Sequence, residues 1–160
     1  MTPVAQWDEI ARAASRSAAT SATREDAMQS LVDLLWNALH PHGVSWIGFY
    51  EADPSGAPQM ILRARRDKPA CSPIGLHGAC GQCLLGRKPL VVRDVRDLGE
   101  GYIACDPLDQ SEVVVPCLRP DGSAWGVLDA DSHLVGAFSD ADALGLQRSL
   151  EAAGLSAPFR

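Results

Sequence analysis

Residues 112–130 read EVVVPCLRPDGSAWGVLDA, and this stretch decides the fold. Two largely apolar runs, the first of them rich in valine, flank the turn Pro120-Asp-Gly122. Such a pair of runs around a Pro/Asp/Gly turn is typical of a β-hairpin. We therefore expect Glu112–Leu118 and Ala124–Ala130 to be neighbouring antiparallel strands.

Working outward from this hairpin, apolar runs with a period of two predict further strands at 44–50, 60–65 and 90–95. Apolar residues at helical spacing predict helices at 4–16, 24–39 and 140–153, and a short one at 81–85. Thr23 and Ser139 stand where N-caps of two of these helices are expected. Mostly antiparallel strands between terminal helices indicate an α+β fold, with residues 1–22 as an N-terminal helical segment and 23–155 as a single domain.

Composition narrows the classes of function. The chain has 160 residues, of which 46% are hydrophobic, as suits one domain with a real core. Its formal charge is -6 and its Lys and Arg residues are scattered, which argues against nucleic-acid binding and against an anionic membrane surface. No apolar run approaches the ~20 residues of a membrane span, and 1–13 shows no basic start followed by an apolar stretch. We expect a cytoplasmic protein.

Strand parity sorts the side chains onto two faces of the sheet. The core-facing set is Ile47, Phe49, Val113, Val115 and Leu128, whereas the opposite face gathers Trp46, Tyr50, Glu112, Asp129 and Asp131. An aromatic pair beside three carboxylates would form a pocket for a cationic or zwitterionic ligand. Parity alone favours a simpler interpretation, in which this face is exposed and the acids merely lie at strand ends.

Five cysteines carry the remaining chemistry. In a reducing compartment they are buried thiols, metal ligands or redox catalysts rather than a structural disulfide framework. Cys105 and Cys71 lie in predicted loops, where one thiol can attack and the other resolve, although both can also be inert loop thiols. Asp106 would disfavour a thiolate at Cys105, because a neighbouring anion raises a thiol pKa.

Cys80 and Cys83 form a C-x-x-C pair that allows several interpretations. No βαβ pattern surrounds it, which weakens a thioredoxin-like dithiol. A zinc site would need Cys71 and His77 as its other ligands, at irregular spacing. Packing of both thiols from a short helix against the sheet is favoured, and Cys117 is expected to be an inert core residue. The histidines are expected at the surface.

The chain also resembles a known family through a set of motifs that occur in family order. These are Trp46-Ile-Gly-Phe-Tyr50, Ala70-Cys71, Gly78-Ala-Cys-Gly81, Asp94-Val95, Tyr102-Ile-Ala-Cys-Asp106, Ser111-Glu-Val-Val-Val-Pro116 and Gly126-Val-Leu-Asp-Ala-Asp-Ser132. Together, and over most of the chain, they are similar to the GAF-domain free methionine-(R)-sulfoxide reductases. Single motifs are weak, but the I-A-C-D, S-E-V-V-V-P and L-D-x-D-S segments are specific in combination.

The resemblance implies a GAF-like fold with a mostly antiparallel sheet of about five or six strands, terminal helices on one face and a pocket under loops on the other. It implies that Cys105 attacks the sulfoxide, Cys71 resolves and Cys80 is an auxiliary thiol. Substrate binding maps to Trp46, Tyr50, Glu112, Asp129 and Asp131. It further implies a cytoplasmic homodimer that thioredoxin recycles, with neither a metal nor a bound cofactor. The alternative is a non-catalytic GAF module that binds a small ligand or senses redox state.

Departures from the family pattern affect the expected ligand. The segment Arg63–Lys68 is far more basic than the family's usual G-P-F-Q-G, and Tyr102 stands where a histidine is usual. Cys83 and Cys117 are additional. All three mapped cysteines and all three carboxylates remain, so the resemblance still implies catalysis, whereas the arginines would favour an anionic ligand instead.

Overall fold

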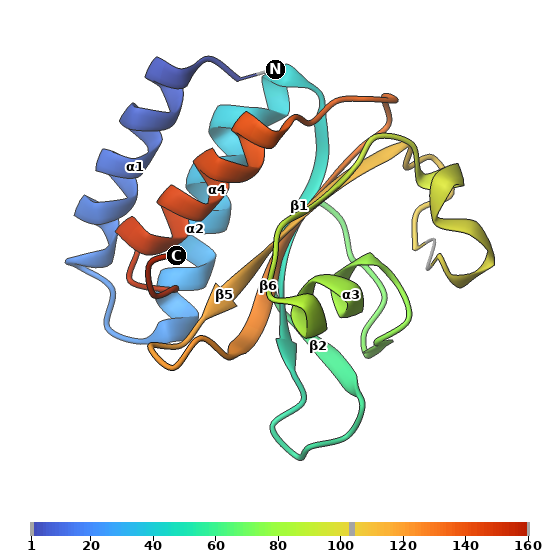
Figure 1. Cartoon of the computed structure of the whole chain (residues 1–160). Helices are drawn as coiled ribbons and strands as arrows, with labels where there is room; N and C mark the ends of the chain where they lie inside the picture. Colours follow the sequence, from blue (N-terminus) through green and yellow to red (C-terminus); the bar gives the residue numbers. More distant parts are fainter. Residues whose placement is uncertain (1, 103–104, 160) are drawn as a thin grey trace.

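The computed structural model describes residues 2–102 and 105–159. A six-stranded antiparallel sheet, in the order β3-β2-β1-β6-β5-β4, runs through its centre (Figure 1). The strands are β1 (Val44–Ala52), β2 (Gln59–Arg66), β3 (Ile74–Gly75), β4 (Leu90–Val92), β5 (Ser111–Leu118) and β6 (Ala124–Ser132). Ile103 and Ala104 of the Tyr102–Asp106 motif lie outside the described residues.

Three helices cover one face of the sheet, and a short helix lies over the other (Figure 1). The covering helices are α1 (Val4–Ala18), α2 (Arg24–Leu39) and α4 (Asp140–Ala152), and the short helix is α3 (Ala79–Gly86). The expected caps are present, since Thr23 accepts a hydrogen bond from the backbone of Asp26, and Ser139 forms a capping box with Asp142. The α+β class with GAF-like layering is thus confirmed.

The alternation of side chains along β1, β5 and β6 divides the interior into two apolar clusters. Phe49, Val113 and Leu128 are fully buried against the helices, and Cys117 belongs to this cluster as expected. Val114 and Val127 belong to the second cluster, between the sheet and α3. Each strand therefore supplies the core with one set of residues and the opposite face with the other.

The expected strand at 90–95 is wrong at its end. β4 stops at Val92, and the 3₁₀ segment η2 (Val95–Gly101) begins where the Asp94 side chain accepts a hydrogen bond from the backbone of Arg96. The apolar pattern favours a longer strand, but the Asp94 side chain favours the turn. It accepts a hydrogen bond from a backbone N–H that would lack a partner if the strand continued. β3, with two residues, is too short to leave a periodic signal.

No helix in the described ranges combines the length and the apolar character that a membrane span requires.

Candidate active site

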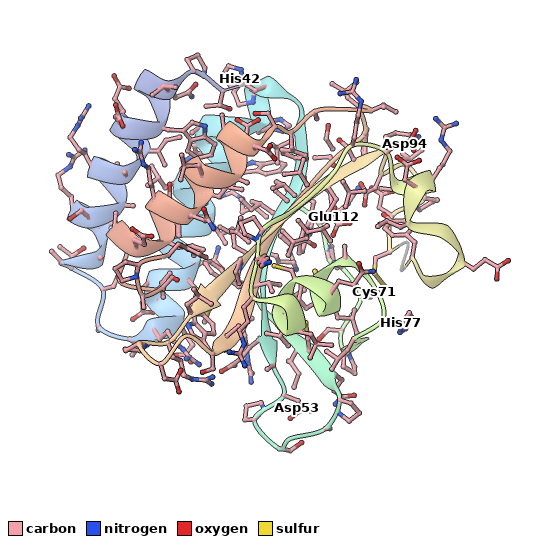
Figure 2. All side chains as sticks on the ribbon, viewed as in Figure 1. His42, Asp53, Cys71, His77, Asp94 and Glu112 are labelled. Atoms are coloured by element: carbon pink, nitrogen blue, oxygen red, sulfur yellow. A yellow bond between two sulfur atoms is a disulfide. The ribbon has the colours of Figure 1, made fainter. Side chains whose placement is uncertain are left out.

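The three predicted carboxylates come together on the face of the sheet that α3 covers. Glu112 on β5 is the register partner of Asp131 on β6, and Asp129 lies opposite Gly48 of β1. Glu112 and Asp129 are each only 5% exposed, and Asp131 is half-buried. Figure 2 shows Glu112 in the interior of the molecule rather than on its surface. The interpretation of an exposed sheet face is therefore wrong, because α3 and two loops cover the acids.

These acids form one wall of a cavity of about 110 Å³. Trp46 and Tyr50 of β1 lie beside them, with ring centroids 6.1 Å apart. The complete lining comprises Trp46, Tyr50, Lys68, Pro69, Ala70, Ile74, Gly78, Ala79, Cys80, Tyr102, Cys105, Asp106, Asp109, Glu112, Asp129 and Asp131. The cavity thus brings together the aromatic pair, the acids and Cys105, which lie far apart in the sequence.

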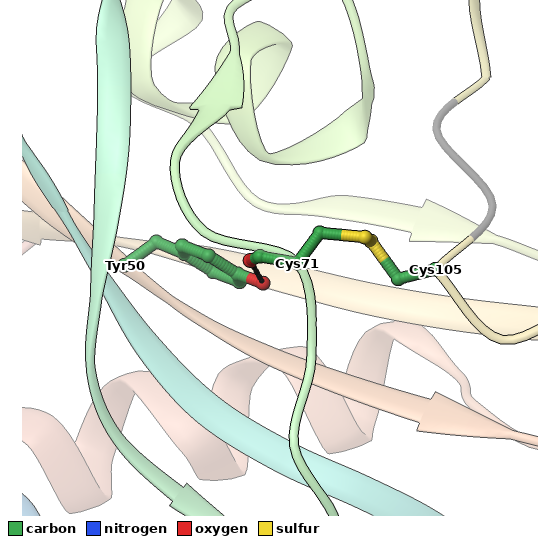
Figure 3. Close-up of a disulfide and its surroundings, with 3 residues drawn as sticks. All are labelled: Tyr50, Cys71 and Cys105. Atoms are coloured by element: carbon green, nitrogen blue, oxygen red, sulfur yellow. Dashed lines mark hydrogen bonds between the residues drawn. A yellow bond between two sulfur atoms is a disulfide. The ribbon is translucent and has the colours of Figure 1, made fainter.

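Both aromatic side chains also hold the loop that closes the cavity. The Trp46 indole donates a 2.9 Å hydrogen bond to the Lys68 carbonyl, and the Tyr50 hydroxyl donates a 2.7 Å hydrogen bond to the Cys71 carbonyl (Figure 3). Gly48, between the two aromatics, leaves room for the Trp46 ring, which a Cβ at that position would strike. The backbone around Cys71 is thereby fixed to the sheet at two points.

Cys71 and Cys105 are joined by a disulfide, with their Cα atoms 5.7 Å apart and their positions 34 apart in sequence (Figure 3). Both residues are exposed, and Cys105 lines the cavity. The two loop thiols named as a possible attacking and resolving pair are therefore within bonding reach of each other. An exposed disulfide at the mouth of a cavity is accessible to an external reductant.

The remaining thiols lie deeper. The Cys80 sulfur and carboxylate oxygens of Glu112 and Asp129 lie within 4.8 Å of one another. Burial, together with the charges of Asp129 and Glu112, raises the pKa of the Cys80 thiol well above its usual range. Cys83 is also buried, and its sulfur lies 3.2 Å from the Lys88 carbonyl, within hydrogen-bonding distance. Packing of both thiols from a short helix is confirmed.

The hypothetical zinc site of Cys71, His77, Cys80 and Cys83 is not assembled. Cys71 is bonded to Cys105, whereas Cys80 lies with the two carboxylates. His77 is exposed, and Figure 2 shows its side chain at the outer surface, away from Glu112. Cys71 and His77 lie in the segment that precedes α3, whereas Cys80 and Cys83 lie on α3 itself.

Crowding of buried acids sets the electrostatics of the cavity. Burial raises the pKa of Glu112 to about 7, and a hydrogen bond with Asp129 partly opposes this rise. Burial raises the pKa of Asp129 and Asp131 well above the usual range, and the negative charges of their neighbours raise it further. One oxygen of Asp129 has no hydrogen-bond partner in the described part of the chain. The wall can therefore hold a proton at neutral pH and attract a cation.

Sequence reasoning missed several residues of the site. Lys68 forms an ion pair with Asp106, and the His133 Nε2 atom lies 3.0 Å from the same carboxylate. The bond from Lys68 is the main cause that lowers the pKa of Asp106 to about 2. Asp109 is buried and has its pKa raised to about 6 by burial and by the charge of Asp106. These residues lie in loops without periodicity, so only the proximity of Asp106 to Cys105 gave a signal.

Comparison with solved structures relates this geometry to known proteins. The chain superimposes on free methionine-R-sulfoxide reductase from Neisseria meningitidis in complex with its substrate, with a TM-score of 0.82 and 29% identity, over 98% of this chain and 94% of that one. The corresponding values for the reduced form of fRMsr of Staphylococcus aureus are 0.82 and 28%, over 92% of each chain.

Curated sequences point in the same direction. The chain is 37% identical over 101 residues to free methionine-R-sulfoxide reductase of Saccharomyces cerevisiae, covering 61% of this chain and 56% of that protein. It is 35% identical over 107 residues to the Escherichia coli protein of the same name, covering 66% and 61%. The alignments thus span less than two thirds of these relatives' own lengths.

A model of the GAF domain matches residues 21–155, which include the whole sheet, α2, α3 and α4. The fold, the cavity under α3 and the sequence match agree, and the chain therefore belongs to the GAF domain family.

Proposed function

We propose that this protein reduces free methionine (R)-sulfoxide to methionine, with Cys105 as the nucleophile and Cys71 as the resolving cysteine. The observation that carries the proposal is the disulfide between these residues, one of which lines a cavity walled by buried acids. A sulfoxide reductase needs a nucleophilic sulfur, a second thiol and a proton donor in one place. The similarity to reductases from four organisms supports the same conclusion.

The cycle begins when the Cys105 thiolate attacks the sulfur of the sulfoxide and forms a sulfur–sulfur bond, while the sulfoxide oxygen accepts a proton. The hydroxyl group then moves from the sulfoxide sulfur to the Cys105 sulfur, which leaves a sulfenic acid on Cys105, and methionine departs with the electron pair of the broken sulfur–sulfur bond. The Cys71 thiol then attacks the sulfenic sulfur, its proton leaves with the hydroxyl group as water, and the disulfide forms. The structure corresponds to this oxidised state.

Glu112 is the acid that we assign to the first step. A sulfoxide oxygen is a poor leaving group until it accepts a proton, and a carboxyl with a pKa of about 7 is partly protonated at neutral pH. A carboxylate oxygen of Asp129 lies within 4.8 Å of one of Glu112, and each group affects the pKa of the other, which supports a role for Asp129 in holding this proton. Cys80 remains an auxiliary thiol in the proposal, since its sulfur lies next to the same carboxylates.

Asp131 and the aromatic pair give the cavity its preference for a free amino acid. The Asp131 carboxylate would attract the ammonium group of free methionine sulfoxide, whereas a methionine within a peptide has an uncharged nitrogen there. Trp46 and Tyr50 offer ring faces to the side chain and to the cation. The cavity of about 110 Å³ suits a small molecule.

The basic segment Arg63–Lys68 does not redirect the site toward an anionic ligand. Arg63 is paired with Glu51, and Arg66 with Asp33, at 2.6 Å and 3.0 Å. Lys68, which does line the cavity, is paired with Asp106. Since these cations are already neutralised by acids, the net field in the cavity stays negative and favours the zwitterion.

Recycling completes the proposal. We infer that thioredoxin reduces the disulfide, since both sulfurs belong to exposed residues, and that the enzyme acts as a cytoplasmic homodimer without a metal or bound cofactor. The competing hypothesis is a GAF module that binds a ligand or senses redox state without turnover.

The decisive experiment measures consumption of free methionine (R)-sulfoxide in the presence of dithiothreitol. We expect turnover by the wild type and its loss in Cys105→Ser, whereas Cys117→Ser, in the helix-covered core, remains active. Unchanged turnover in Cys105→Ser would remove the nucleophile that we assign. Absence of turnover in the wild type, with tight binding of the sulfoxide, would favour the sensor.

A further inference from the structure

The two loops that carry the redox cysteines are joined by an ion pair as well as by the disulfide. Lys68 precedes Cys71 by three residues, and Asp106 directly follows Cys105. The ammonium of Lys68 contacts the carboxylate of Asp106, whose side chain is only 15% exposed. The charged link and the covalent link therefore connect the same two short segments.

The Cys71 segment has a firm position of its own. Its backbone is hydrogen-bonded to Trp46 through the Lys68 carbonyl and to Tyr50 through the Cys71 carbonyl. The Cys105 segment is anchored further along, where Gln110 donates a backbone hydrogen bond of 2.8 Å to Ser132. Between these anchors, the Asp106 carboxylate also accepts a bond from the Leu108 backbone, which fixes its own orientation.

Reduction removes the covalent link and leaves the charged one. In the described part of the chain, Lys68–Asp106 is the hydrogen bond that connects residues 67–73 with residues 105–110. We propose that Lys68 is a positioning residue, which holds the resolving Cys71 beside Cys105 while both are reduced. The inference rests on the proposed function, since it assigns Lys68 a task in the same cycle.

The physical reason is effective concentration. A sulfenic acid at Cys105 is resolved only as fast as the Cys71 thiol reaches it, and it otherwise remains open to further oxidation. The ion pair restricts the relative motion of the two loops, which raises the local concentration of one sulfur around the other. The disulfide can form only when the two loops lie together. An interaction that stabilises this arrangement therefore also stabilises the disulfide relative to the two thiols.

His133 extends the same network. Its Nε2 atom lies 3.0 Å from the Asp106 carboxylate and 3.7 Å from Asp109. It reaches Asp106 from the end of β6, where it is half-exposed, and so ties the Cys105 segment to the sheet rather than to the Cys71 segment. Lys68, not His133, therefore spans the gap that the disulfide must close.

The test measures the reduction potential of the Cys71–Cys105 pair in dithiothreitol redox buffers, without any sulfoxide. We expect Lys68→Met to make the disulfide about three- to tenfold easier to reduce, which corresponds to ~15–30 mV. Lys68→Arg is expected to restore most of the difference. Arg65→Met is the matched control, because Arg65 lies in the same basic segment and its guanidinium contacts a backbone carbonyl instead of Asp106.

Two further readouts separate positioning from a general structural effect. The double variant Lys68→Met/Asp106→Asn is expected to be no worse than either single variant, because the two residues act as one unit. After one equivalent of oxidant, Lys68→Met is expected to trap more sulfenic acid with dimedone than the wild type does.

An unchanged potential in Lys68→Met, or independent effects of the two substitutions, would overturn the inference. Because the potential is measured without a sulfoxide, this outcome is distinct from a failure of the proposed reductase activity.

Discussion

Glu112 and Asp131 face each other across the β5–β6 ladder as register partners. Two like charges directly opposite each other on adjacent strands destabilise a sheet. The pair is tolerated because burial raises the pKa of both carboxyls, so that the two together retain a proton, which we assign to Glu112, at pH values where an exposed carboxyl is ionised. This arrangement makes the stability of the fold depend on pH.

Stability is expected to fall as the pH rises from about 4.5 to above 7. The pKa of Glu112 is about 7 in the folded protein against 4.5 for an ordinary glutamate, so the native state binds the extra proton within this window. The free energy of unfolding should decrease by roughly 3 kcal/mol for this group. Chemical denaturation at several pH values measures the slope.

Glu112→Gln is the variant that checks this assignment. Its amide cannot ionise, so its stability profile is expected to be flatter than that of the wild type over the same range. A profile as steep as that of the wild type would show that other groups bind the proton.

Selectivity for a free amino acid is expected to depend on Asp131. Asp131→Asn should lower kcat/KM for free methionine sulfoxide by about 10- to 100-fold, because the ammonium group loses its charged partner. The already low rate with N-acetylmethionine sulfoxide should change little, since that substrate has no ammonium group. Asp121→Asn, in the β5–β6 turn, is the control. Equal losses with both substrates would contradict the assignment.

Mass mapping of the oxidised protein is expected to find one disulfide, Cys71–Cys105, with Cys80, Cys83 and Cys117 as thiols. The buried thiols hold their protons because burial raises their pKa, so they are poor nucleophiles. Cys80→Ser should accordingly retain a full first turnover. A disulfide between Cys80 and Cys105 in a large share of the protein would instead place Cys80 in the relay.

Two glycine substitutions are expected to separate stability from catalysis. A Cβ at Gly145 would strike the Trp7 ring in the helical layer, so Gly145→Ala should cost ~1–3 kcal/mol of stability without a change in KM. A Cβ at Gly81 would strike the backbone of Leu76, so Gly81→Ala should displace α3 and raise KM. Thermal denaturation and steady-state kinetics distinguish the two effects, and an unchanged KM in Gly81→Ala would show that α3 does not shape the cavity.

The strands and helices of this chain were predictable where apolar residues recur with the period of a strand or a helix and are buried on one side of that element. Val113, Val115 and Leu128 share one face by strand parity, since Glu112 and Asp129 mark the opposite face, and all three are buried against the helices. The same parity correctly placed Glu112, Asp129 and Asp131 on one face. It could not show that the face is covered, because α3 reaches it through a loop whose path leaves no pattern in the sequence.

The loop residues of the site were the least predictable part. Lys68 and Asp106 are separated by 38 positions, and their contact depends on how two loops fold back over the sheet. Asp106 alone suggested an unfavourable neighbour for a thiolate at Cys105. The structure supplies the counter-ion, Lys68, which lowers the pKa of that carboxyl to about 2 and offsets its charge.

The alternation along β6 constrains how this strand can change during evolution. Val127 and Asp129 lie on the α3 side of the sheet, where Asp129 lines the cavity, whereas Leu128 faces the helices. Loss or gain of a single codon within the strand would exchange the two sets, which would turn an acid toward the helices and a leucine toward the ligand. We therefore expect that this strand tolerates replaced residues, whereas insertions and deletions are tolerated only in the turns at its ends.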